Sequence, residues 1–292
     1  MINLLVANFF DVQKYEKNVN KSKSGKEKSL LFWIFWVICV YLQTKRIIEM
    51  PNKLTRHIPN AVTSCNLLSG CIACVFALQG NYSTAFLFIL LGACFDFLDG
   101  LTARALRAYS NIGKELDSLA DDITFGLAPS AMIFSLLREG FAQQYGCDSF
   151  SGLGLLPFVA FIVAVFSALR LAKFNIDERQ TSSFIGLPTP ANAIFWGSLI
   201  TGMDEKIIAS PSLLWVTVAL IALMSWLLVA EIPMFSLKFH NLSWKENKVR
   251  YIFLAVSLAL LIALRLNGFA AVIGWYIILS LLTGQQKTDT KE

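Results

Sequence analysis

The chain has 292 residues, of which 55% are hydrophobic and 15% are charged, and its mean hydropathy is +0.58. Soluble domains are about 45–50% apolar and about 25% charged, so this composition excludes an ordinary soluble domain and predicts a membrane protein with several spans. The net charge of +5 is modest. In a membrane protein such charges are informative mainly through their placement in loops, so we expect no nucleic-acid partner.

The chain before the first predicted span divides into two parts. Residues 1–49 combine a Lys-rich stretch with a short apolar run, Leu30–Leu42, which is shorter than the roughly 20 residues that a span needs. We expect these residues to form an N-terminal appendage, translated from upstream of a start at Met50. Residues 50–60 are expected to form an amphipathic helix at the membrane surface.

Apolar stretches at regular intervals predict a transmembrane domain over residues 61–283. The first six predicted spans lie at 61–79, 84–104, 115–137, 155–174, 187–203 and 213–235. Two shorter stretches follow at 251–264 and 269–283, near the lower length limit of a span, and residues 284–292 form a polar tail. The predicted fold class is therefore all-α, a polytopic membrane helix bundle.

Basic residues divide unequally between the two sides of these spans. The side that holds Met50 also holds most of the Lys and Arg residues in the loops and span ends. The opposite side holds only Arg138, Lys206 and Arg265. Because cytosolic loops carry the excess of basic residues, the Met50 side is predicted to face the cytosol, and the protein is expected in a bacterial-type cytoplasmic membrane.

Four carboxylates lie at the cytosolic ends of the second and third predicted spans, namely Asp96, Asp99, Asp117 and Asp121. Spacings of three and four residues place each pair on one face of a helix. A lone carboxylate at membrane depth costs about 2.5–3.5 kcal/mol on insertion scales, and several together would repel one another unless cations neutralise them. Two divalent ions would balance the four charges. Two metal ions about 3.5–4 Å apart are a known arrangement in phosphoryl-transfer enzymes. The set therefore predicts a two-metal site.

The residues alone leave two other interpretations of the aspartates open. In a purely structural role they would cap helices and pair with Arg104, Arg107 and Lys114 at the membrane interface. In an ion-coupled transporter they would mark an ion path, as intramembrane acids often do. Gly100 and Gly113 permit close ligand approach, and Arg104 could present a guanidinium fork to a phosphate, so these neighbours favour a phosphate substrate.

The stretch from Asp96 to Asp121 matches DxxDGxxARx8Gx3Dx3D at every fixed position, and this pattern resembles the signature of the CDP-alcohol phosphotransferase family. The resemblance implies a six-helix membrane core, extended here by two C-terminal spans, and transfer of a substituted phosphate from a CDP-linked donor to an alcohol with release of CMP. It implies two Mn²⁺ or Mg²⁺ ions held by the four aspartates, with Asp121 also the general base, and a homodimer. It further implies a nucleotide and diphosphate pocket shaped by Gly100, Ala103, Arg104 and Gly113.

Polar side chains occupy one face of the first predicted span near its start. Asn60, Thr63 and Asn66 recur at helical spacing, with Gly70 one turn further on. We expect the three polar residues to contribute to the nucleotide and diphosphate pocket. The alternative is that they cap the helix and that the small residues let it pack closely against a neighbour.

Two later stretches bear on the acceptor alcohol. The run LRLAKFN at 169–175 and the turn FIGLPTP at 184–190 resemble the phosphatidylserine synthase branch of the family. This implies CDP-diacylglycerol and L-serine as substrates, with the acyl chains among the membrane lipids. Arg170, Lys173 and Asn175 are expected to bind the serine or a phosphate, although Lys173 replaces the usual Arg and lacks its bidentate fork. The alternatives are membrane-edge anchoring by these cations, or another acceptor such as glycerol phosphate, inositol phosphate or choline.

Overall fold

The computed structural model describes residues 57–146, 152–177, 185–234 and 244–285, and the side chains of these except 244–246 and 283–285. Helices make up these ranges apart from turns and one isolated antiparallel bridge, between Ile185 and Pro233, so the predicted all-α class is confirmed. The predicted appendage at 1–49, residues 50–56 of the predicted surface helix, and the tail from 286 lie outside the described residues.

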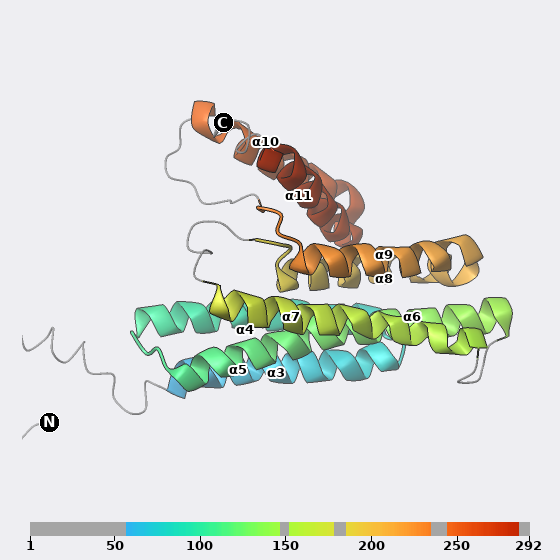
Figure 1. The fold of residues 1–292 in the computed structure, drawn as a ribbon, viewed down its shortest axis with the longest axis horizontal. Coiled ribbons are helices and arrows are strands. Elements are labelled where there is room, and N and C mark those ends of the chain that lie inside the picture. The colour runs from blue at the N-terminus through green and yellow to red at the C-terminus, as the bar shows by residue number, and fades with distance from the viewer. Residues whose placement is uncertain (1–56, 147–151, 178–184, 235–243, 286–292) are drawn as a thin grey trace, which may run out of the picture. The chain divides into compact units, whose positions relative to one another are not determined.

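The helices follow the predicted spans in order (Figure 1). They are α3 (His57–Leu78), α4 (Tyr82–Ala105), α5 (Asn111–Asp121), the π-helical η1 (Asp122–Leu127), α6 (Ala128–Tyr145), the 3₁₀-helical η2 (Gly152–Phe161), α7 (Ile162–Ile176), α8 (Thr189–Ala209), α9 (Pro211–Val229), α10 (Trp244–Leu264), the short η3 (Arg265–Asn267) and α11 (Gly268–Gln285). The third predicted span corresponds to α5, η1 and α6 together, and the fourth to η2 and α7. His57–Asn60, predicted as the end of a surface helix, form the first turn of α3.

Six stretches of the described residues are long and apolar enough to cross a membrane: 57–78, 82–105, 111–145, 152–176, 211–229 and 247–282. Helices α10 and α11 share the last of these stretches. Helix α8 falls outside the set because Asp204, Glu205 and Lys206 lie near its C-terminal end. Many large apolar side chains, such as Leu68 and Leu87, are more than half exposed on these helices, as suits a lipid surrounding. The chain is an integral membrane protein.

Local sequence sets several of the helix ends. Asn81 caps α4, since its side-chain oxygen accepts a hydrogen bond from the backbone N–H of Thr84 at 3.2 Å. Gly80 and Gly146 have φ of 75° and 64°, which glycine adopts without strain, and they form the turn before α4 and the end of α6. Pro211 stands at the first position of α9, where its missing N–H is not needed.

Helix α6 lies at the centre of the bundle. All of its residues from Ala128 to Leu137 are buried, and it contacts α3, α8 and η2. The C-terminal pair α10–α11 contacts α8 through defined bonds. Ser198 Oγ donates to the Leu266 carbonyl at 2.6 Å and accepts from the Ala270 N–H at 2.9 Å. The pair is therefore anchored to α8 by specific polar contacts within the described residues.

Candidate metal centre and substrate cavity

Three of the four predicted aspartates come together between α4 and α5. Asp96, Asp99 and Asp117 each offer a carboxylate oxygen, and these oxygens all lie within 4.8 Å of one another. Asp96 and Asp99 lie one turn apart near the end of α4, while Asp117 approaches from α5. The acidic faces of two separate helices thus meet, as the helical spacing of the residues indicates.

The fourth aspartate, Asp121, lies one turn after Asp117 at the end of α5 and borders this cluster. It lies close enough to Asp96 and Asp117 for their negative charges to act on its carboxylate. Its Oδ1 accepts a hydrogen bond from Asn66 Nδ2 of α3 at 3.1 Å. Asn66 is completely buried, so this bond restrains the direction of the Asp121 side chain from the interior of the bundle.

The cluster has the properties of a divalent-cation site. Asp99 Oδ2 and Asp117 Oδ1 are buried, and neither has a hydrogen-bond partner. Among the described residues, no lysine or arginine forms an ion pair with any of the four aspartates. Buried, unpaired carboxylate oxygens are costly, and hard divalent cations are bound by several such oxygens. The residues present therefore fit the predicted metal, and the alternative of simple pairing with Arg104, Arg107 and Lys114 is not observed.

A cavity of about 470 Å³ opens beside the cluster. This volume falls within the roughly 300–1,000 Å³ typical of small-molecule sites. Five of the residues predicted to bind the nucleotide and diphosphate line it together with Asp99 and Asp117; they are Asn60, Thr63, Gly100, Ala103 and Gly113. The rest of the wall comes from Pro59, Lys114 and the residues around the start of α5, namely Ala108, Tyr109, Ser110 and Asn111.

The two glycines of the motif have different surroundings. A Cβ added to Gly100 would meet only Arg104 Nη2, at 4.0 Å, so Gly100 leaves open space for a ligand. A Cβ added to Gly113 would lie 2.8 Å from Asn60 Oδ1 and 2.9 Å from Ser110 Oγ, so Gly113 lets α3 approach α5. Ser110 caps α5, since its Oγ accepts from the Gly113 N–H at 3.0 Å. Ser110 was missed as a cavity residue, although a serine before a helix is a recognisable cap signal.

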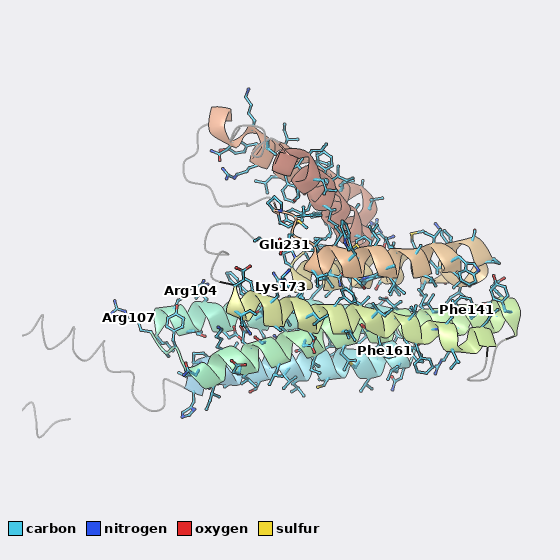
Figure 2. All side chains as sticks on the ribbon, viewed as in Figure 1. Arg104, Arg107, Phe141, Phe161, Lys173 and Glu231 are labelled. Carbon is cyan, nitrogen blue, oxygen red and sulfur yellow. The ribbon has the colours of Figure 1, made fainter. Side chains whose placement is uncertain are left out.

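Two residues predicted to bind the nucleotide or diphosphate do not line the cavity. Asn66 is buried and bonded to Asp121, as described above. Arg104 lies in the last turn of α4, and Figure 2 shows it with Arg107 at one end of the bundle, opposite the end that carries Phe141. The guanidinium Nη2 of Arg104 lies 4.0 Å from the position that a Cβ on Gly100 would take.

Close packing of α3, α4 and η1 holds the helices that carry the acidic cluster in place. Thr124 of η1 is completely buried, and its Oγ1 donates to the Asn66 carbonyl at 3.0 Å. A Cβ added to Gly70 of α3 would lie 2.4 Å from Thr124 Oγ1, and one added to Gly92 of α4 would lie 2.5 Å from Thr124 Cγ2. Glycine at both positions thus lets α3 and α4 close on η1, directly after Asp121. Short π-helical segments of this kind are frequent at functional sites.

The three residues predicted to contact serine have separate partners. Lys173 Nζ lies 3.3 Å from Glu231 Oε1, and both side chains are largely exposed (Figure 2). Asn175 Nδ2 donates to Ser118 Oγ at 2.8 Å, which ties the end of α7 to α5. Arg170 is buried, its Cζ lies 5.1 Å from the centre of the Phe174 ring, and the negative charge of Asp121 acts on it. Arg170 is thus buried and within the electrostatic influence of Asp121.

Comparison with known proteins identifies the family. The family model described as CDP-alcohol phosphatidyltransferase matches residues 56–230, more than half of the chain. The chain belongs to the CDP-alcohol phosphatidyltransferase family. The matched range ends with α9, so the family core comprises the helices from α3 to α9, and α10 and α11 follow it. This agrees with the predicted six-segment core and two C-terminal helices.

Individual relatives of this chain carry names from this family. A CDP-diacylglycerol–serine O-phosphatidyltransferase of Bacillus subtilis is 38% identical over 138 residues, which are 46% of this chain and 70% of the relative. A protein of the same name from Helicobacter pylori is 27% identical over 244 residues, 80% of this chain and 93% of the relative. An archaetidylserine synthase of Methanothermobacter thermautotrophicus is 30% identical over 176 residues, covering 59% and 70% of the two chains. The first two names are those of the branch that the sequence predicted.

Proposed function

We propose that this chain transfers the phosphatidyl group of CDP-diacylglycerol to the hydroxyl of L-serine, giving phosphatidylserine and CMP. The observation that carries the proposal is the meeting of three carboxylates within 4.8 Å beside a cavity of nucleotide size, at the family's motif. The names of the relatives support serine as the acceptor over glycerol phosphate, inositol phosphate or choline.

Asp96, Asp99, Asp117 and Asp121 would hold two Mn²⁺ or Mg²⁺ ions. Bound at such a site, divalent ions supply electrostatic stabilisation of a diphosphate and of the charge on the departing CMP. Asp99 and Asp117 line the cavity, so the ions would meet the diphosphate at that part of its wall. Gly100 leaves room for the diphosphate there, and Arg104 offers a guanidinium to it.

Asp121 is the general base of the proposed reaction. Its carboxylate takes the proton of the serine hydroxyl as the serine oxygen attacks the phosphorus on the lipid side of the diphosphate. The bond between this phosphorus and the bridging oxygen breaks, and CMP leaves with that oxygen. Asn66 keeps one Asp121 oxygen engaged at 3.1 Å, so the base is held in one orientation for the transfer.

Arg170 provides the cation for the carboxylate of the incoming serine. It is buried and the negative charge of Asp121 acts on it, whereas Lys173 is engaged with Glu231 and Asn175 with Ser118. We assign Lys173 and Asn175 the supporting role of placing the last turn of α7. The acyl chains stay in the bilayer, the site opens to the cytosol of a bacterial-type cytoplasmic membrane, and the protein acts as a homodimer.

The test is an assay of CMP release by the purified protein with CDP-diacylglycerol, Mn²⁺ and one alcohol at a time. We expect CMP to form with L-serine and not with glycerol phosphate, inositol phosphate or choline. Release with one of those alcohols in place of serine would change the acceptor while keeping the family reaction. Ion flux into vesicles without any CMP would instead support an ion-coupled transporter and refute the enzymatic proposal.

A further inference from the structure

The loop between α4 and α5 places an aromatic ring at the rim of the substrate cavity. Tyr109 lines this cavity, and 70% of its surface is exposed. Among the described side chains, no aromatic ring stacks on Tyr109 and no cation lies over it. A large aromatic surface therefore stands uncovered beside the site, although its neighbour Ala108 is buried.

Both flanks of the loop are fixed by hydrogen bonds, so the backbone of Tyr109 is held beside the cavity. The Leu106 N–H donates to the Thr102 carbonyl at 2.9 Å, and the Ala108 N–H donates to the Ala103 carbonyl at 3.0 Å. Arg107 adopts a left-handed conformation with φ of 48°, which turns the chain sharply after α4. On the other flank, Ser110 caps α5 as described above. The position of Tyr109 follows from these restraints at its two sides.

Different parts of the cavity wall carry side chains of different chemical character. Asp99 and Asp117 stand at one part of it, where cations and a diphosphate would be held, and small or polar residues such as Asn60 and Gly100 line much of the remainder. Among the described residues that line the cavity, Tyr109 is the aromatic one. A CDP-linked donor brings one flat aromatic group into the cavity, the cytosine base, and bases stack on tyrosine rings whatever their hydrogen-bonding edges.

We propose that Tyr109 is a substrate-binding residue that stacks on the cytosine base of the donor and of the product CMP. This inference rests on the proposed function, because it takes the ligand to be a CDP-linked lipid. It assigns the outer rim of the cavity to the base and the aspartate end to the diphosphate. An exposed tyrosine can also serve as an anchor at the membrane interface. In that role Tyr109 would affect KM in vesicles but not CMP binding in detergent, so the two roles can be distinguished by experiment.

The experiment measures CMP binding by calorimetry, with Mn²⁺ present, to the detergent-solubilised full-length protein. We expect Tyr109→Ala to weaken CMP binding roughly five- to a hundredfold, the range for loss of one base–aromatic stack, and Tyr109→Phe to bind like the wild type. Ile112→Ala is the matched control, since Ile112 is 73% exposed on the neighbouring helix and does not line the cavity. In turnover assays, Tyr109→Ala should raise KM for CDP-diacylglycerol with little change in kcat.

Each outcome decides the inference. Wild-type affinity for CMP in Tyr109→Ala overturns it and leaves the proposed function intact. A higher KM in vesicles with unchanged CMP binding in detergent also overturns it, because that result assigns Tyr109 to the membrane interface. Failure of the wild-type protein to bind CMP at all refutes the proposed function itself. Because Tyr109 is exposed, thermal melting of the variants should match the wild type, which separates a binding defect from misfolding.

Discussion

Asn66 of α3 and Asp121 of α5 are joined by a hydrogen bond of 3.1 Å that spans 55 positions of sequence. Asn66 also accepts a hydrogen bond on its backbone carbonyl from Thr124, so one buried residue contacts both the fourth aspartate and the π-helical turn that follows it. Through this link the first helix of the bundle determines where the proposed base points.

Substituting Asn66 should impair turnover more than folding. In Asn66→Ala, Asp121 loses its donor and can rotate, and we expect kcat to fall about 10–100-fold, the cost typical of removing a partner that orients a metal-site ligand. KM for CDP-diacylglycerol should change little. Ser64→Ala is the control, because Ser64 Oγ bonds only to the Asn60 carbonyl of its own helix and is exposed. A wild-type kcat in Asn66→Ala would contradict the positioning role.

Asp99→Asn should abolish turnover without preventing membrane insertion. Asp99 is the most buried of the three clustered aspartates, and one of its oxygens has no protein partner, so its replacement removes a metal ligand. We expect CMP release to fall by more than about a hundredfold. Asp204→Asn on α8 should stay active, since Asp204 lies outside the acidic cluster. Substantial activity in Asp99→Asn, with the protein inserted, would remove Asp99 from the metal site.

Gly70→Ala tests the close approach of α3 to η1. The new Cβ would lie 2.4 Å from Thr124 Oγ1 and 2.8 Å from Thr124 Cα, so the two elements must separate. We expect a loss of about 1–3 kcal/mol in unfolding free energy, as for other overpacked sites, together with reduced activity. Gly274→Ala on α11 is the control, because nothing lies within 4 Å of its added Cβ. Equal thermal stability of the two variants would show that the contact at Thr124 is not tight.

Arg170 and Lys173 should differ sharply in their effects on serine binding. Arg170 is buried and the negative charge of Asp121 acts on it, and we expect Arg170→Ala to raise KM for serine by about tenfold or more, since a charge-assisted hydrogen bond to the serine carboxylate is lost. Lys173 forms an exposed pair with Glu231, so Lys173→Ala should change KM by less than about twofold and unfolding free energy by at most about 1 kcal/mol. Initial rates at varied serine concentration check both. A larger effect at Lys173 than at Arg170 would reverse the assignment.

The sequence was sufficient to predict the helices and most of the acidic cluster. Apolar runs locate the spans, and the spacing of Asp96, Asp99 and Asp117 puts their side chains on helix faces that can meet. The third predicted span was too short at both ends. Helix α5 begins at Asn111 behind its Ser110 cap, and α6 continues beyond Arg138 to Tyr145, because polar residues extend a helix past its apolar part.

Contacts between distant segments could not be predicted in this way. The bond from Asn66 to Asp121 and the pair of Lys173 with Glu231 join residues 55 and 58 positions apart, and their formation depends on which helices pack together. The side chain of Asn175, which the sequence predicted to bind the serine or a phosphate, bonds to Ser118 of α5, a partner that the sequence did not indicate. The π-helical turn after Asp121 was likewise not predicted, and it lies where Thr124 packs between Gly70 and Gly92, which are both distant from it in sequence.

Binding of Mn²⁺ to the purified, metal-free protein tests whether the four aspartates form a metal site. We expect saturable binding of two ions per chain in the wild type, followed by electron paramagnetic resonance. We also expect a rise of several degrees in melting temperature, because ligands that bind the folded state stabilise it. Asp99→Asn should lose both the binding and the rise in melting temperature. If the wild-type protein binds no Mn²⁺ or Mg²⁺ saturably while it releases CMP from CDP-diacylglycerol, the metal site proposed for the four aspartates is wrong.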